Sequence, residues 1–196
     1  MDPALQAIIQ LIILFFVIFD PFVSLAVFVI ATQKIDSIQR NKTATLAVAV
    51  ALVLSMLVLL FGQNVLDWLS TSLEDFRVAG GIILALLGIK MAMGHSLVES
   101  GKLEQGSARA IAAIIGTPLL TGPAAITTII IATNDYGRMI TGASVAIVLA
   151  ITAIMLYQAE RINKFLGPTV IQAISTILGL ITIAWGVKFI RAGLGI

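Results

Sequence analysis

The sequence predicts an all-α membrane protein with six transmembrane helices, arranged as two three-helix halves of opposite orientation. Of its 196 residues, 59% are hydrophobic and only 11% are charged, a composition that soluble globular domains do not normally have. The apolar residues fall into six stretches, each close to the roughly 20 residues that a spanning helix needs. Six spans use nearly the whole chain, so we expect a single transmembrane domain.

The individual helices follow from these stretches in order. The opening Met1-Asp2-Pro3 carries no basic residue, so we do not expect a cleaved signal peptide before the first helix. Charged residues concentrate in the connectors, where the chain leaves the membrane. The expected helices cover residues 5–32, 43–66, 76–94, 108–133, 139–157 and 169–190.

The distribution of lysine and arginine predicts the orientation of the chain in the membrane. Seven of these residues lie in the first, third and fifth connectors, and Lys90 can reach the headgroups on the same side. The other side has four: Arg77, Arg138, Lys188 and Arg191. Because cytoplasmic loops carry an excess of basic residues, we expect a multi-pass protein of the cell membrane with both termini outside.

Glycines recur at equal spacing in the third and sixth helices. Gly81 and Gly88 stand seven residues apart, and Gly179 and Gly186 repeat this spacing 98 residues later. Small residues on one face allow two membrane helices to approach closely. We therefore expect these glycines to support helix packing rather than to contact a ligand.

The first and fourth helices match at nearly the same distance. Asp20-Pro21 in the first helix corresponds to Thr117-Pro118 in the fourth, 97 residues later. Each half contains an odd number of spans, so the second half must enter the membrane from the opposite side. The sequence thus predicts inverted repeats over about residues 1–100 and 101–196, an architecture typical of secondary transporters.

Asp20 is the carboxylate that this pattern places deepest within a hydrophobic stretch. A charge at that depth needs a partner or a water-filled cavity, and functional use is the default hypothesis. Asp before Pro is also a common helix start, which implies a break in the first helix at mid-membrane. Three roles stay open for Asp20: proton carrier, ammonium ligand and helix cap.

The fourth helix carries the stronger break. Gly116, Pro118, Gly122 and Pro123 all weaken a helix within eight residues. A simple kink is one interpretation, since glycine and proline are frequent in membrane helices. Irregular backbone at membrane depth is tolerated only where it is buried in protein or lines a polar cavity. Corresponding breaks in both halves favour a binding site between them.

The residues around both breaks suit a small, mostly uncharged substrate. The helix starts at Pro21 and Pro123 offer free N–H groups to a carboxylate, while hydroxyl and carboxylate groups nearby can meet an ammonium. No buried Arg or Lys is expected that would clamp a phosphate, and Thr127 and Thr128 are expected to bond back to their own helix. The candidate substrate-binding residues are Asp20, Ser24, Thr117, Thr121 and Gly122.

Composition and motifs also exclude several classes of protein. The chain has no cysteine and one histidine, and its net charge is +2, so disulfides, thiolate metal sites and a nucleic-acid footprint are not expected. It contains no Ser-His-Asp set, phosphate-binding glycine loop or metal-ligand spacing. We therefore expect neither an enzyme nor a bound cofactor.

Two segments resemble signature segments of the MarC family, which includes SnatA-like small neutral amino acid transporters. These segments are residues 76–91 and 117–128, and the resemblance runs through all six expected helices. It implies transport of glycine, alanine and similar amino acids through a six-helix fold related to the LysE-type exporters. The chain departs from the family pattern after Pro21, where Val23-Ser24 replaces Gly-Asn, and at Ala124, where the family has glycine.

A secondary transporter that works by alternating access around a midplane site is therefore the favoured function. A passive pore would need a continuous polar lining, and a multidrug or metabolite exporter would need a large aromatic-lined pocket. The sequence leaves open the direction of transport, coupling to a proton or Na⁺, and the formation of a homo-oligomer.

Overall fold

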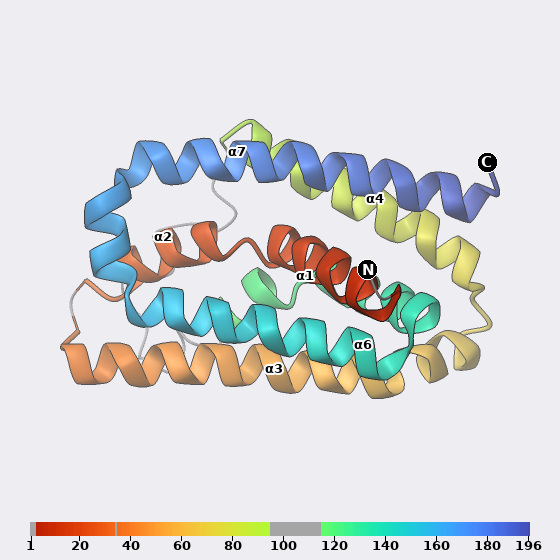
Figure 1. Cartoon of the computed structure of the whole chain (residues 1–196), viewed down its shortest axis with the longest axis horizontal. Coiled ribbons are helices and arrows are strands. Elements are labelled where there is room, and N and C mark those ends of the chain that lie inside the picture. The colour runs from red at the N-terminus through yellow and green to blue at the C-terminus, as the bar shows by residue number, and fades with distance from the viewer. Residues whose placement is uncertain (1–2, 34, 95–114) are drawn as a thin grey trace.

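The computed structural model describes residues 3–33, 35–94 and 115–196, and every regular element in these ranges is a helix. Most of the helices lie side by side along one long axis (Figure 1). Four are long and apolar enough to cross a membrane: Ala4–Ala31, Ser37–Trp68, Pro123–Tyr157 and Ala159–Leu194. The all-α prediction is confirmed for the described residues, whereas the six spans and their inverted repeat stay a prediction.

The first expected helix is two helices in the structure. α1 (Pro3–Phe19) and α2 (Pro21–Ala31) are joined by Asp20, whose φ of 36° and ψ of 75° lie in the left-handed region. Proline has no N–H to donate, and its ring clashes with the turn before it. A helix therefore stops before Pro21 and a new one starts there.

The next two helices begin earlier than expected because polar residues cap them. α3 (Ser37–Trp68) begins where Asp36 Oδ1 accepts from the Gln39 N–H at 2.8 Å. α4 (Leu73–Ala92) begins where Ser72 Oγ accepts from the Asp75 N–H at 3.0 Å. Hydropathy marks only the apolar part of a helix, so the expected ranges 43–66 and 76–94 omit these first turns.

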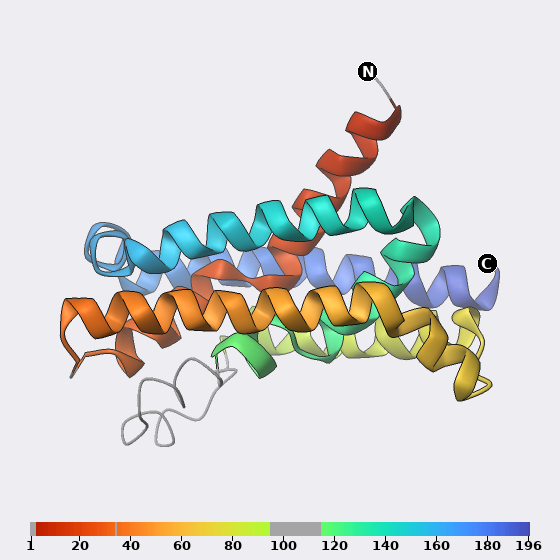
Figure 2. The same ribbon diagram turned by 90° about the horizontal axis from the view of Figure 1, so that it is seen from below.

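The rest of the described chain consists of a short π-helix, η2 (Ile115–Leu120), and two long helices, α6 (Pro123–Tyr157) and α7 (Ala159–Leu194). The expected fourth helix, 108–133, starts outside the described residues. Gly137 and Gly167 interrupt α6 and α7 with φ of 81° and 72°, which glycine adopts readily. Figures 1 and 2 show the chain reversing within α6 and turning again near the start of α7.

α4 and α7 pack through their glycines. A Cβ added to Gly81 would lie 2.5 Å from the Gly186 carbonyl oxygen, and one added to Gly88 would lie 2.5 Å from that of Gly179. Both distances are too short for any side chain, so only glycine permits this approach of the two backbones. The expectation that the glycines support helix packing is confirmed.

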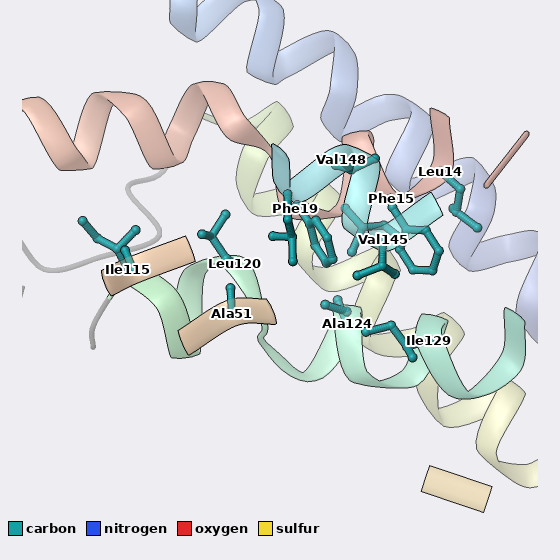
Figure 3. Close-up of a cluster of buried hydrophobic side chains, with 14 of the residues drawn as sticks. Leu14, Phe15, Phe19, Ala51, Ile115, Leu120, Ala124, Ile129, Val145 and Val148 are labelled. Carbon is teal, nitrogen blue, oxygen red and sulfur yellow. The ribbon is translucent and has the colours of Figure 1, made fainter. Parts of the chain in front are cut away.

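The buried core lies where α1, η2 and α6 meet. Phe15 and Phe19 of α1 point toward Val145 and Val148 of α6, and Leu120 of η2 belongs to the same cluster (Figure 3). Large apolar side chains on the outer faces of the long helices are exposed, as expected for surfaces in contact with lipid. Examples are Phe61, Leu86, Ile177 and Leu180.

Candidate functional site

Asp20 ends α1 and caps α2. Left-handed backbone angles are better tolerated by Asp than by most non-glycine residues. Its Oδ1 accepts from the Val23 N–H at 3.2 Å, which satisfies one of the free donors at the start of α2. Ser24 Oγ donates to the Phe19 carbonyl at 3.4 Å, on the other side of the break. Groups on both sides of Pro21 therefore stabilise this interruption.

The second carboxylate oxygen of Asp20 reaches a distant helix. Ser175 Oγ of α7 donates to Asp20 Oδ2 at 2.9 Å. Asp20 is 4% exposed and Ser175 is 1% exposed, and a carboxylate so deeply buried needs partners within the protein. Asp20 is thus both the cap of α2 and the link between α2 and α7.

Ser175 was not singled out by the sequence, because it is one of many hydroxyls in apolar stretches. Most of these bond to their own helix, as Thr127 and Thr128 do with the carbonyls of Pro123 and Ala124 at 2.9 and 2.8 Å. Those two threonines behave as expected. Ser175 differs only in facing Asp20, and this depends on how α7 packs in three dimensions.

The second break lies at Thr121-Gly122, between η2 and α6. Gly122 caps α6 without a side-chain hydrogen bond, and Pro123 occupies its first turn. Thr121 Oγ1 donates to the Ala51 carbonyl of α3 at 3.3 Å. A Cβ added to Gly116 would lie 2.6 Å from the Ala47 carbonyl oxygen, so η2 packs directly against the α3 backbone.

The structure brings the two breaks into one buried region but does not join their polar groups. Phe19 and Leu120, which precede the two breaks, lie in the same apolar cluster together with Ala124 (Figure 3). The polar side chains have different partners: Asp20 accepts a hydrogen bond from α7, and Thr121 donates one to α3. Thr117 and Pro118 lie on η2, and their side chains are outside the described part of the chain.

A cavity of about 340 Å³ lies next to the first break, between α2, the end of α4 and the start of α7. Among the described residues, the polar side chains that line it are uncharged: Gln33, Asn163, Gln172 and Ser175. Ser175 therefore lines the cavity with one side and bonds to Asp20 with the other. The remaining lining is apolar or glycine: Val23, Ala26, Val27, Val29, Ile30, Met91, Gly94, Pro168 and Ile171.

Charged side chains stand away from this lining. Among the described residues, Arg40 pairs with Glu160 and Arg77 pairs with Asp135, and none of the four lines the cavity. The same part of the chain contains no group of three His, Cys, Asp or Glu residues that could hold a metal ion. A neutral lining beside one buried carboxylate suits a small ligand of low net charge.

Comparison with known proteins identifies relatives along almost the whole chain. The model of the MarC family of integral membrane proteins matches residues 5–195. A UPF0056 membrane protein of Buchnera aphidicola is 31% identical, covering 91% of this chain and 88% of its own. One of Methanocaldococcus jannaschii is 30% identical, covering 91% of each. The inner membrane protein YhgN of Escherichia coli is 26% identical, covering 97% of each. No solved structure matches the chain.

Proposed function

Because this chain belongs to the MarC family of integral membrane proteins, we propose that it is a secondary transporter of small neutral amino acids such as glycine and alanine. The observation that carries the proposal is the uncharged cavity of about 340 Å³ that ends on the buried Ser175–Asp20 pair. The resemblance of residues 76–91 and 117–128 to the SnatA-like transporters points to the same substrates.

The size and chemistry of the cavity support a small zwitterion. Its volume is at the low end of the roughly 300–1,000 Å³ of ligand pockets. Asp20 accepts hydrogen bonds from Val23 and Ser175, and a carboxylate has about four lone-pair sites, so it keeps acceptor capacity for an ammonium group that approaches through the cavity past Ser175. The amides of Gln33, Asn163 and Gln172 offer N–H donors to a carboxylate. Whether Asp20 binds the ammonium or carries a coupling proton is part of the proposal to be tested.

We also propose that the chain crosses the membrane six times as two inverted halves, with both termini outside. The glycine contacts support this. Gly81 and Gly179 are repeat partners, as are Gly88 and Gly186, yet Gly81 meets Gly186 and Gly88 meets Gly179. Such crossed pairing is what a two-fold axis between related helices produces.

A second crossed pair supports the same relation between α3 and α6. The Thr45 hydroxyl lies 2.7 Å from the Tyr157 hydroxyl, and a Cβ added to Gly142 would lie 3.1 Å from Leu59. Tyr157 stands 98 residues after Leu59, and Gly142 stands 97 residues after Thr45. The Thr45–Tyr157 and Leu59–Gly142 contacts are therefore repeat equivalents of each other, as the two glycine contacts between α4 and α7 are.

Reconstitution in liposomes tests the transport proposal. Uptake of labelled glycine and alanine is expected to saturate with concentration and to accelerate when the liposomes are preloaded with unlabelled substrate, because alternating access exchanges substrate one molecule at a time. Linear, non-saturating uptake would favour a passive pore. If neither amino acid is taken up but bulky organic cations are transported, an exporter of other compounds would be favoured. An enzyme would be favoured only if the labelled substrate were converted to a chemical product.

A further inference from the structure

The two ends of the bundle differ in what lies between the helices, a cavity at one end and an ion pair at the other. The end of α2 and the start of α7 lie at one end, and the reversal in α6 and the start of α4 lie at the other (Figure 1). Gln33 follows the helix start at Pro21 by twelve residues, and Asp135 follows the helix start at Pro123 by twelve, a match of helix starts that differs from the 97-residue match of Pro21 with Pro118. Ser175 stands 98 residues after Arg77. Gln33 and Ser175 line the open cavity, whereas Asp135 and Arg77 form an ion pair.

A close helix contact accompanies this ion pair. A Cβ added to Gly80 of α4, one helical turn after Arg77, would lie 1.9 Å from Thr127 Cγ2 of α6, so the two helices are in direct contact near the ion pair. The Arg77 and Asp135 side chains are 19% and 33% exposed, which places them at the rim. The corresponding end of the bundle is therefore closed by one polar and one apolar contact.

The ion pair is built so that it can open. Arg77 Nη2 bonds to Asp135, but Arg77 Nε is buried with no partner among the described residues. A single-contact pair is weaker than the two-bond arrangement that arginine and a carboxylate often form. Partial exposure also lowers the cost of separating the charges. The Arg77–Asp135 pair thus favours contact between α4 and α6 at this end of the bundle, and it can still be broken.

We propose that the Arg77–Asp135 pair and the Gly80–Thr127 contact form the closed gate of a second route to the substrate site. This inference rests on the proposed transport function: the gate is closed while the α2–α7 cavity is open, and it opens when that cavity closes. Arg77 and Asp135 are positioning residues of the gate and are not substrate ligands.

Thiol labelling tests the gate without measuring transport. The chain has no cysteine, so Thr127→Cys, which replaces the methyl group against Gly80 and leaves the ion pair as the closing contact, reports on the gate, and Ala26→Cys, in the cavity lining, reports on the cavity. The probe is N-ethylmaleimide, whose approach is insensitive to charge changes, applied to protein in lipid nanodiscs so that both ends are reachable. Labelling of Ala26→Cys is expected to be at least about tenfold faster, because Thr127 is buried.

Breaking the ion pair is expected to open the gate. Asp135→Asn or Arg77→Gln, added to Thr127→Cys, should accelerate its labelling by about fivefold, the change expected for one partly exposed pair. Exchanging the charges with Arg77→Asp and Asp135→Arg should restore slow labelling. Glu160→Gln is the matched control, since it removes the ion pair with Arg40 away from the gate while Arg40 keeps its hydrogen bonds to the Thr32 and Ile35 carbonyls, and it should leave the rate unchanged.

The outcomes separate the gate from the transport proposal. Unchanged labelling of Thr127→Cys in both gate variants, or equal acceleration by Glu160→Gln, would overturn the gate while Ala26→Cys still reacts. An Ala26→Cys that resists labelling would instead contradict the water-accessible cavity on which transport rests. Arg77→Lys keeps the charge and should label slowly, and a melting temperature near that of the parent shows that each variant is folded.

Discussion

Both helix breaks lie directly before a proline, yet different chemistry holds them. The first break uses a charged side chain, Asp20, which caps α2 and bonds to Ser175 of α7. The second uses Gly122, which has no side chain to cap α6, and depends on the contact of Gly116 with the α3 backbone. Only the first break adjoins the cavity. The proposed function therefore depends on one break, while the other is stabilised by close packing.

Replacing the charge at the first break should have the largest effect. Asn also tolerates left-handed angles and caps helices, so Asp20→Asn is expected to keep the melting temperature but reduce glycine uptake at least about tenfold, because a hydrogen bond to a charged group contributes about 1.5–3 kcal/mol. Asp20→Ala should lower both the melting temperature and the uptake of glycine. Full uptake by Asp20→Asn, measured in the same liposomes, would remove Asp20 from the mechanism.

Packing should dominate at the second break. Gly116→Ala puts a methyl group 2.6 Å from a carbonyl oxygen and is expected to cost about 1–3 kcal/mol of stability, seen as a lower melting temperature in detergent. Gly142→Ala is the matched control, because its new methyl would meet only the flexible end of Leu59 at 3.1 Å. Equal melting temperatures for the two variants would show that η2 does not depend on this contact.

The link from Asp20 to α7 should have an intermediate effect. Ser175→Ala removes the hydrogen bond to Asp20 Oδ2 and is expected to cost about 1–2 kcal/mol and to raise the KM for glycine severalfold. Ser144→Ala removes a buried hydroxyl that bonds only to the Ile140 carbonyl of its own helix and should leave the KM unchanged. A similar KM for glycine in both variants would mean that Ser175 does not contribute to substrate binding in the cavity.

The smallest effect is expected at the hydrogen bond between Thr121 and α3. Thr121 Oγ1 donates to the Ala51 carbonyl at a long 3.3 Å, so Thr121→Val should lower stability by no more than about 1 kcal/mol. Urea or thermal unfolding measures this change. A loss several times larger would show that the second break, like the first, is held by its side chain.

The sequence predicted the helical class, the discontinuity at Asp20 and the packing role of the glycines, because these depend on hydropathy, proline geometry and side-chain size. It missed the early starts of α3 and α4, which depend on the caps Asp36 and Ser72 rather than on hydropathy. It also missed Ser175, because nothing local distinguishes a serine that faces Asp20 from one that bonds to its own helix. The sequence also did not predict the cavity, because the cavity depends on how α2, α4 and α7 pack in three dimensions.

The Asp20–Ser175 bond also has a consequence for biogenesis. Most buried hydroxyls in this chain bond to a carbonyl of their own helix, as Thr128 and Thr182 do, so each such helix can enter lipid as soon as it is synthesised. Asp20 belongs to the first helices to leave the ribosome, and its partner lies 155 residues later in the last. The Ser175 hydroxyl therefore becomes available to Asp20 Oδ2 only after α7 has been synthesised, whereas Oδ1 finds its partner Val23 at once.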